Sequence, residues 1–458
     1  MSTPSYMHRP LREACMVVIL GGGPAGRIAS IRLASAGKDV TLVEYGTIGG
    51  QCLHYGCMPV CALNDVARFL QTAGTYRTLG ITDSVSEINF PALLREMQQV
   101  QKTITSVLDR ETRDAGVRIL YGNEGRFDGK QVVVGNEALP AEAVILATGS
   151  RPNVPDIPGI ESPGVFTPHT LWHIDHLPKE LVIVGGGVMA AEFAYIFSRF
   201  GCRVTVLSRS SFLKTVDEHI RKRAIRELAG VAIREQAGLV SVERKGEKLH
   251  LTIRDEGNDT ILECDAALLA AGLVPRSEMI AGVEKRPNGE VVVDDRMQTN
   301  LPGVYACGDV TGPPFLTPVA RYQGIVAADN ILGKDRRRDY SAVPQAINLG
   351  YELAFCSDGS RTAKPLVIPG PAGPGTFWSV PASDTGLAKI MVEADGSISG
   401  ICSVSPGGGL IAGYMAFLMK HHFSVHDFED FIEVHPSTDG VYGLAKYASE
   451  ILRKRKDS

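Results

Sequence analysis

The stretch "MVVILGGGPAGRIASIRLASAGKDVTLVE", residues 16–44, decides the fold. An apolar run predicts a buried strand; a glycine-rich turn and a helix follow it, and a second strand ends in Glu44. In the pattern G-x-G-x-x-G, Gly21 allows the tight turn, Gly23 lets the backbone approach a pyrophosphate, and Gly26 lets helix and strand pack closely. This order predicts a dinucleotide-binding fold in which Glu44 accepts hydrogen bonds from the ribose hydroxyls of an adenosine.

The pattern returns in "ELVIVGGGVMAAEFAYIFSRFGCRVTVLSRSS", residues 180–211. Gly185, Gly187 and Ala190 occupy the key positions of this second turn. Two dinucleotide folds in one chain predict two cofactors that pass electrons to each other.

The second fold differs at the end of its second strand. Where the first fold has Glu44, this one has Arg209, with Lys214 nearby. A carboxylate repels a 2′-phosphate, whereas an arginine binds it. The second fold is therefore predicted to take NADPH, with NADH as the alternative if Arg209 is an ordinary surface arginine.

Length and composition narrow the classes of function. A chain of 458 residues holds about three domains on the usual prior, and 44% hydrophobic residues are ample for packed cores. The net charge of −4 gives no reason to expect a nucleic-acid partner. No apolar run predicts a membrane span, and the apolar stretch near the N-terminus is too short for a signal peptide. We expect a cytoplasmic protein, in which neighbouring cysteines indicate metal or redox chemistry.

Three cysteines stand close together in "GTIGGQCLHYGCMPVCAL", residues 46–63. Cys52, Cys57 and Cys61 lack the close C-x-x-C spacing of a zinc site, and the sequence has no matching second cluster, so no metal is predicted. A redox pair of Cys52 and Cys57 is favoured over inert core cysteines. For Cys61, a small apolar filler is favoured over a third redox thiol.

Periodicity predicts a helix from Cys52 to Phe69. In a straight helix, residues five apart have Cα atoms roughly 8.6 Å apart, and a disulfide needs about 4.4–6.8 Å. Gly56 and Pro59 are expected to disturb the helix and let the two thiols approach. The helix N-terminus is expected to stabilise a thiolate.

Four motifs in order resemble the class I pyridine nucleotide–disulfide oxidoreductases, the family of dihydrolipoamide dehydrogenase, glutathione reductase and mercuric reductase. "GGQCLHYGCMP" (49–59) is similar to the redox-disulfide motif and "LATGSRP" (146–152) to the segment that links the FAD and NAD domains. "LPGVYACGDV" (301–310) is similar to the second FAD motif, and "FIEVHPSTDG" (431–440) to the motif around the catalytic histidine.

The resemblance implies an α/β fold with two Rossmann-like domains, for FAD and NAD(P), and a C-terminal α+β dimerisation domain. It also implies a homodimer in which the histidine of one subunit reaches the disulfide of the other. The FAD-binding domain is expected to consist of two segments, residues 1–150 and 276–340. The NAD(P)-binding domain (151–275) is expected between them, and the C-terminal interface domain (341–458) after them.

The resemblance also assigns roles to residues. NAD(P)H gives hydride to FAD, and the reduced flavin opens the Cys52–Cys57 disulfide. Cys57 corresponds to the thiolate beside the flavin, Cys52 to the thiol that attacks a disulfide substrate, and His435 to the acid/base that serves the departing thiol. The further residues expected to contact FAD are Gly50, Gly149 and Asp309, with Asp309 on the ribityl chain.

The chain departs from the family pattern at the flavin. Val60 and Cys61 stand where the family usually has a lysine, although the matching acid, Glu192, is kept. A carboxylate without its cation is expected to rise in pKa or to find another partner.

A second departure concerns the histidine. Gly440 replaces the glutamate that usually orients it, so Asp439 or Glu433 is expected to orient His435.

The leading hypothesis is an FAD-dependent oxidoreductase that exchanges electrons between NAD(P)H and a small-molecule disulfide or dithiol. Mercuric reductase is disfavoured because the chain has no cysteine pair after Cys402. Two alternatives stay open: a flavin-dependent reductase of a quinone or metal ion, and a redox-sensing flavoprotein without turnover. The Pro/Gly-rich stretch 367–377 is expected to be a surface loop.

Overall fold

The computed structural model describes residues 16–83, 87–122, 124–360, 363–368, 385–434 and 440–456. His435 and Asp439 lie outside these residues, as does most of the loop 367–377. The chain forms two compact units. The first comprises Met1–Met58, Glu96–Arg151 and Leu273–Arg338, and the second comprises Pro59–Arg95, Pro152–Gly272 and Asp339–Ser458. The domain ranges expected from the sequence stay a prediction.

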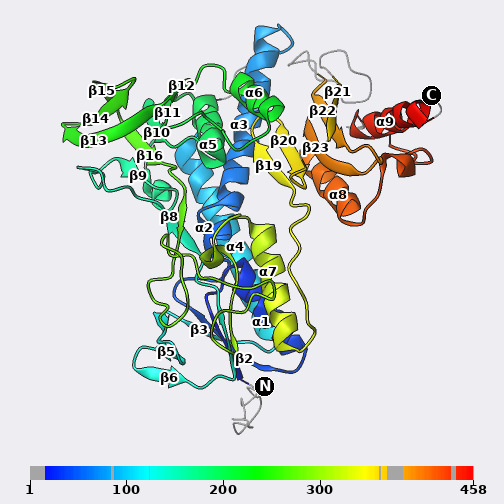
Figure 1. The fold of residues 1–458 in the computed structure, drawn as a ribbon. Coiled ribbons are helices and arrows are strands. Elements are labelled where there is room, and N and C mark those ends of the chain that lie inside the picture. The colour runs from blue at the N-terminus through cyan, green and yellow to red at the C-terminus, as the bar shows by residue number, and fades with distance from the viewer. Residues whose placement is uncertain are drawn as a thin grey trace, which may run out of the picture. The chain divides into compact units, whose positions relative to one another are not determined.

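The first unit is built on a parallel sheet with the strand order β18–β7–β1–β2–β3. Figure 1 labels β2 and β3 of this sheet and the helices α1 and α7. The strands are β1 (Met16–Leu20), β2 (Asp39–Glu44), β3 (Arg118–Tyr121), β7 (Ala143–Leu146) and β18 (Val304–Ala306). β1 pairs in parallel with β2 on one side and with β7 on the other. The strand order therefore reverses beside β1, and open sheets of this kind bind ligands at the carboxyl ends of the strands at this point.

Both faces of this sheet are covered. Val17 and Ile19 of β1 pack with the helices α1 (Pro24–Ser35) and α7 (Thr317–Ile331). Val18 and Leu20 face the opposite way, toward a small antiparallel sheet of β4 (Gly125–Phe127), β5 (Val132–Val134) and β6 (Glu137–Leu139). Burial on both faces explains why β1 is an unbroken apolar run. The remaining elements are α2 (Gly50–His54), most of α4 (Phe90–Asp114), η2 (Asp309–Thr311), β8 (Ser150–Pro152) and β17 (Leu273–Pro275).

The second unit contains another parallel sheet, with the order β12–β11–β10–β16–β9. Its strands are β9 (Val165–Phe166), β10 (Glu180–Val184), β11 (Arg203–Ser208), β12 (Ala232–Glu235) and β16 (Ala266–Leu269). The elements beside this sheet in sequence are α5 (Val188–Arg199), α6 (Glu218–Glu227) and the antiparallel strands β13 (Ala237–Lys245), β14 (Lys248–Asp255) and β15 (Asn258–Cys264). The predicted α/β class with two dinucleotide-type sheets is confirmed.

The C-terminal region of the second unit is an antiparallel sheet in the order β19–β20–β23–β22–β21. Its strands are β19 (Gln345–Asn348), β20 (Glu352–Ser357), β21 (Lys364–Ile368), β22 (Leu387–Val392) and β23 (Ile398–Ser405). α8 (Gly408–Lys420) and α9 (Gly440–Lys456) share a hydrophobic core with this sheet. No helix in the described residues has the length and apolar character needed to cross a membrane.

The helix expected from Cys52 to Phe69 is interrupted at Gly56, one of the two residues expected to disturb it. α2 ends at His54 and α3 (Cys57–Thr78) begins three residues later. Pro59 lies in the first turn of α3, where a missing N–H costs nothing, so Pro59 does not cause the break. The break comes at Gly56, whose N–H donates to Gln51 O at 2.8 Å. A Cβ at Gly56 would lie only 3.3 Å from that same oxygen.

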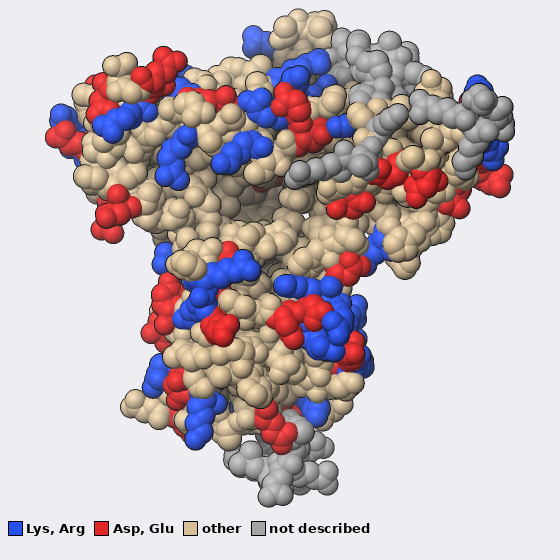
Figure 2. Space-filling view, in the orientation of Figure 1, with Lys and Arg blue, Asp and Glu red and all other residues tan. Residues whose placement is uncertain are grey.

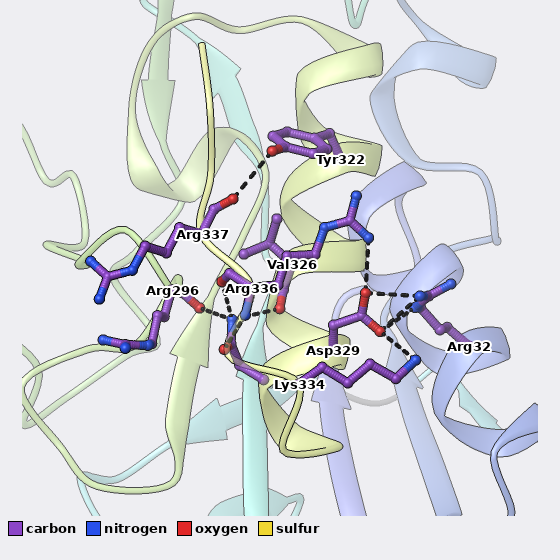
Figure 3. A network of polar contacts seen from close by, with 9 residues as sticks. Arg32, Arg296, Tyr322, Val326, Asp329, Lys334, Arg336 and Arg337 are labelled. Atoms are coloured by element: carbon purple, nitrogen blue, oxygen red, sulfur yellow. Dashed lines mark hydrogen bonds and ion pairs between the residues drawn. The ribbon is translucent and has the colours of Figure 1, made fainter.

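A network of charged side chains joins α1, α7 and the segment that follows α7 (Figure 3). At its centre is Asp329, whose side chain is only 3% exposed. Arg32 donates from Nε and Nη2 to the two carboxylate oxygens at 2.8 Å each. Arg336 donates to the same carboxylate at 2.9 Å, and Lys334 pairs with it at 3.1 Å.

Charged side chains of both signs are interspersed on the visible face of each unit in Figure 2. The described residues on this face therefore form no extended basic field of the kind that attracts nucleic acid.

Candidate functional site

The glycine turn after β1 leaves no room for side chains at two positions. Gly21 has φ +109°, and a Cβ there would lie 2.2 Å from Ala147 O at the end of β7. A Cβ at Gly26 would lie 2.0 Å from Gly21 O. Both glycines are thus required by the close packing of β1, β7 and α1.

The cysteine segment packs directly on this turn. Gly49 N donates to Gly22 O at 3.0 Å, and a Cβ on Gly50 would lie 2.7 Å from Gly23 Cα. A Cβ on Gly23 itself would meet only Gly50 Cα, at 3.9 Å, so open space lies above the N-terminus of α1. Gly23 caps α1 without any side-chain hydrogen bond. The open approach to this helix N-terminus fits a pyrophosphate.

Glu44 lies at the end of β2 beside the same turn. Its carboxylate accepts from Gly22 N at 2.6 Å and from Gly46 N at 2.7 Å. These bonds hold the carboxylate at the turn, and each oxygen keeps a lone pair for a ribose hydroxyl.

Asp309 occupies the second FAD motif at the start of η2. Ser150 Oγ donates to its Oδ2 at 2.6 Å, and within the described part of the chain its Oδ1 has no partner. Burial raises the pKa of the Asp309 carboxyl, and the bond from Ser150 only partly offsets this. A buried carboxylate that keeps one oxygen available fits the hydroxyls of a ribityl chain. Gly149, next to Ser150, has φ +75°, which favours glycine.

Asp309 is held in place by a residue that the sequence did not single out. Gln323 of α7 is buried, and its Oε1 accepts the N–H of Gly308 at 2.6 Å. Together with Glu44 and the glycine turn, this arrangement fits FAD: the first unit has a place for each of the adenosine ribose, the pyrophosphate and the ribityl chain.

Cys52 lies on α2 and Cys57 is the first residue of α3; both are in the reduced thiol form in this structure. The pKa of Cys57 is raised, first because its thiol hydrogen-bonds the Cys52 sulfur. The expectation that the helix N-terminus stabilises a thiolate stays a prediction. Thr317 Oγ1, at 3.8 Å from Cys57 Sγ, acts in the opposite direction and lowers the pKa.

Glu192 has found a partner other than a lysine. Within the second unit, its Oε1 accepts from Asn348 N at 2.9 Å and from Asn348 Nδ2 at 3.2 Å. Of the two outcomes expected for this carboxylate, another partner is the one observed. Cys61, one turn after Cys57 in α3, is exposed.

The second glycine turn repeats the constraints of the first. Gly185 has φ +146°, and a Cβ there would lie 2.1 Å from Ala270 O, just after β16. Gly187 caps α5, and a Cβ on it would meet nothing within 4 Å, which leaves room for a pyrophosphate. Ala190 is fully buried in α5.

Two cations follow β11. Arg209 and Lys214 are both exposed, and no carboxylate in the described residues pairs with either. The stem of Arg209 lies along β13, because a Cβ on Gly238 would come 3.7 Å from Arg209 Cγ. Their charges are thus available to an anionic group.

The histidine motif is only partly described. His435 and Asp439 lie outside the described residues. Glu433 pairs with Lys446 of α9 at 2.6 Å, so its carboxylate already has a cationic partner. No group of three or more His, Cys, Asp or Glu among the described residues could hold a metal ion.

Comparisons with known proteins agree on one family. The model of the pyridine nucleotide-disulphide oxidoreductases matches residues 16–324. A dihydrolipoyl dehydrogenase of Chlamydia trachomatis is 30% identical over 461 residues, covering 94% of this chain and 96% of the relative. A leghemoglobin reductase of Glycine max is 28% identical over 445 residues, covering 92% and 85%. In fold, the chain is similar to the HOCl-induced flavoprotein disulfide reductase RclA from Escherichia coli, with TM-score 0.81, 24% identity and coverage of 93% and 98%.

Proposed function

Because this chain belongs to the pyridine nucleotide-disulphide oxidoreductase family, and is thus an FAD-dependent enzyme that uses NAD(P)H, we propose that it reduces a small-molecule disulfide with NADPH through Cys52 and Cys57. The observation that carries the proposal is the packing of the cysteine segment on the glycine turn, Gly50 against Gly23. This contact holds the thiols of α2 and α3 beside the place that fits FAD.

FAD, when bound, supplies the group that takes a hydride from NAD(P)H and passes on two electrons. Gly21, Gly23 and Gly50 would let the backbone approach its pyrophosphate. Asp309 and Glu44 would bind its hydroxyls.

The thiol chemistry belongs to the chain itself. The Cys52 thiolate attacks one sulfur of the substrate, and the first product thiolate leaves and takes a proton from His435. Cys57 then attacks Cys52 Sγ, which closes the protein disulfide and releases the second thiol. Two electrons and two protons restore the dithiol, so each turnover converts one substrate disulfide into two thiols.

The choice of NADPH rests on the charge after β11. Arg209 and Lys214 are exposed, and none of the carboxylates in the described part of the chain pairs with them, at the point where a 2′-phosphate would lie. Arginine recognises a phosphate with paired N–H donors, which a serine or a carboxylate at this position cannot do.

Anaerobic titration tests the electron path and the coenzyme together. We expect NADPH to bleach the flavin and, after two electrons, to produce a long-wavelength absorbance from the Cys57 thiolate. Arg209→Glu should raise the NADPH concentration for half-maximal reduction rate by roughly 10- to 100-fold, with little change for NADH. Arg226→Glu, the same charge change at another exposed arginine, is the control.

If NADPH bleaches the wild-type flavin without producing the long-wavelength band, the proposed disulfide step is ruled out. If Arg209→Glu raises the concentration for half-maximal reduction rate equally for NADPH and NADH, the proposed contact between Arg209 and the 2′-phosphate is contradicted.

We also propose that the enzyme is a homodimer that associates through α8. Leu410, Tyr414 and Phe417 lie on successive turns of this helix and are 82%, 42% and 60% exposed. The opposite face of α8 is packed in the core of the C-terminal sheet. A helix that is apolar on both faces is typical of an interface, and a second copy of the chain is its simplest partner.

Replacing Leu410 and Phe417 with glutamate is expected to convert the dimer into monomers, as measured by light scattering. Turnover should fall with the dimer, because the resemblance places the histidine of each site on the second chain. The control is Ile261→Glu, at a side chain of β15 that is 67% exposed, which should change neither the dimer nor the turnover. A variant that stays dimeric would exclude α8 as the interface.

A further inference from the structure

The carbonyl end of α2 lies directly beside the redox pair. This helix has only five residues, carries Cys52, and ends three residues before Cys57 opens α3. Both Tyr55 N and Gly56 N turn back to Gln51 O, at 2.9 and 2.8 Å. Such a short helix has little stability of its own, so outside contacts must hold its end in place.

One side chain from another helix makes such contacts. Gln101 of α4 donates from Nε2 to Leu53 O at 3.0 Å and to His54 O at 3.2 Å. These are the last two carbonyls of α2. They lie 48 and 47 residues from Gln101 in the chain, and all three residues belong to the first unit.

The start of the helix is also held. The His54 ring nitrogen Nε2 lies 3.1 Å from Ile48 O and 3.0 Å from Thr47 Oγ1, just before α2. With one end held by His54 and the other by Gln101, the segment that carries Cys52 has little freedom to move away from Cys57.

We infer that Gln101 is a positioning residue for the redox pair. By holding the two carbonyls before the break, it keeps the Cys52 and Cys57 sulfurs close, and closeness favours the disulfide over the dithiol. The inference rests on the proposed function, since it concerns the same two sulfurs.

The test is the disulfide equilibrium of the purified, FAD-loaded enzyme in glutathione buffers. The protein disulfide takes two electrons and two protons from two glutathione molecules, which leave as one glutathione disulfide. Rapid alkylation and mass spectrometry then measure the fraction of the Cys52–Cys57 pair that is reduced. The variants are Gln101→Met, which removes both donors, and Gln101→Glu, which keeps shape and polarity but cannot donate.

Both variants should shift the equilibrium about five- to tenfold toward the dithiol, where tenfold corresponds to about 30 mV. The matched control is Gln98→Met, the same substitution at an exposed glutamine of α4, which should not shift it. Thermal midpoints show whether Gln101→Met is destabilised overall. If it is, the result for Gln101→Glu decides whether Gln101 positions the pair.

The outcomes separate the two proposals. If the wild type forms the disulfide and both Gln101 variants match it, or if Gln98→Met shifts equally, Gln101 does not position the pair. If the wild type never forms a Cys52–Cys57 disulfide in any buffer, the proposed function itself fails.

Discussion

Replacing Cys52 with serine is expected to lower disulfide turnover by at least roughly 10³-fold while flavin reduction by NADPH continues. A thiolate is the attacking group in disulfide exchange, and a serine hydroxyl does not ionise in the working range. This change leaves untouched the glycine turn after β1, Asp309 and the second glycine turn. Stopped-flow absorbance measures flavin reduction, and release of thiol from a small disulfide measures turnover.

The third cysteine of the segment provides the control. Cys61→Ser alters an exposed thiol one turn beyond Cys57 and should retain full turnover if Cys61 takes no part in the redox chemistry. Retained turnover in Cys52→Ser would instead support a quinone or metal ion as the acceptor. If NADPH reduces the flavin of the wild type but no acceptor supports turnover, the result would support a redox-sensing flavoprotein.

Replacing Asp329 with alanine is expected to lower the free energy of unfolding by about 3 kcal/mol, because it leaves three cations around a buried site without their anion. Arg32, Lys334 and Arg336 are each partly exposed, which keeps the cost below that of a fully buried charge. Scanning calorimetry should show a lower midpoint. Asp335→Asn in the same loop is the matched control, since Asp335 pairs with Arg296 at an exposed site, and it should change the midpoint little. An equal shift for both variants would contradict the role of burial.

The effect of Asp329 should depend on pH. Burial alone would raise the pKa of this carboxyl, but the hydrogen bonds from Arg336, Arg32 and Lys334 outweigh burial and hold the pKa below its ordinary value. The stabilisation is therefore complete above the pKa of the unfolded chain, about 3.9, and is lost as the pH falls through the lower folded value. The gap between wild type and Asp329→Ala should narrow only below about pH 4.

The predicted glycines illustrate what local pattern can reveal. Gly21 and Gly185 both meet the carbonyl of a neighbouring strand within about 2 Å of an added Cβ. Such a steric constraint excludes every residue but glycine, so it leaves a mark at a fixed spacing in the sequence. The strands and helices around both turns follow the same spacing, and their prediction is confirmed.

The cysteine segment shows where local reasoning fails. The residues between Cys52 and Phe69 have helical periodicity, and both Gly56 and Pro59 are candidates for a break, with nothing in the sequence to choose between them. The observed break lies at Gly56, where the chain turns its N–H groups back to Gln51 O and Gln101 covers the next carbonyls. Hydrophobic periodicity carries no information about a hydrogen bond that another helix donates.

The amino-acid sequence alone was enough to locate the two glycine turns and the parallel sheets around them, and to favour Cys52 and Cys57 as a pair. The folded chain was needed to see that Asn348 takes the place of a lysine beside Glu192, that Gln101 holds the end of α2, and that Asp329 collects three cations. The physical reason is the nature of the partner. A steric limit at a turn dictates a residue type, whereas a backbone N–H or carbonyl bonds to any suitable side chain, so the pairing is decided by which segments the fold brings together.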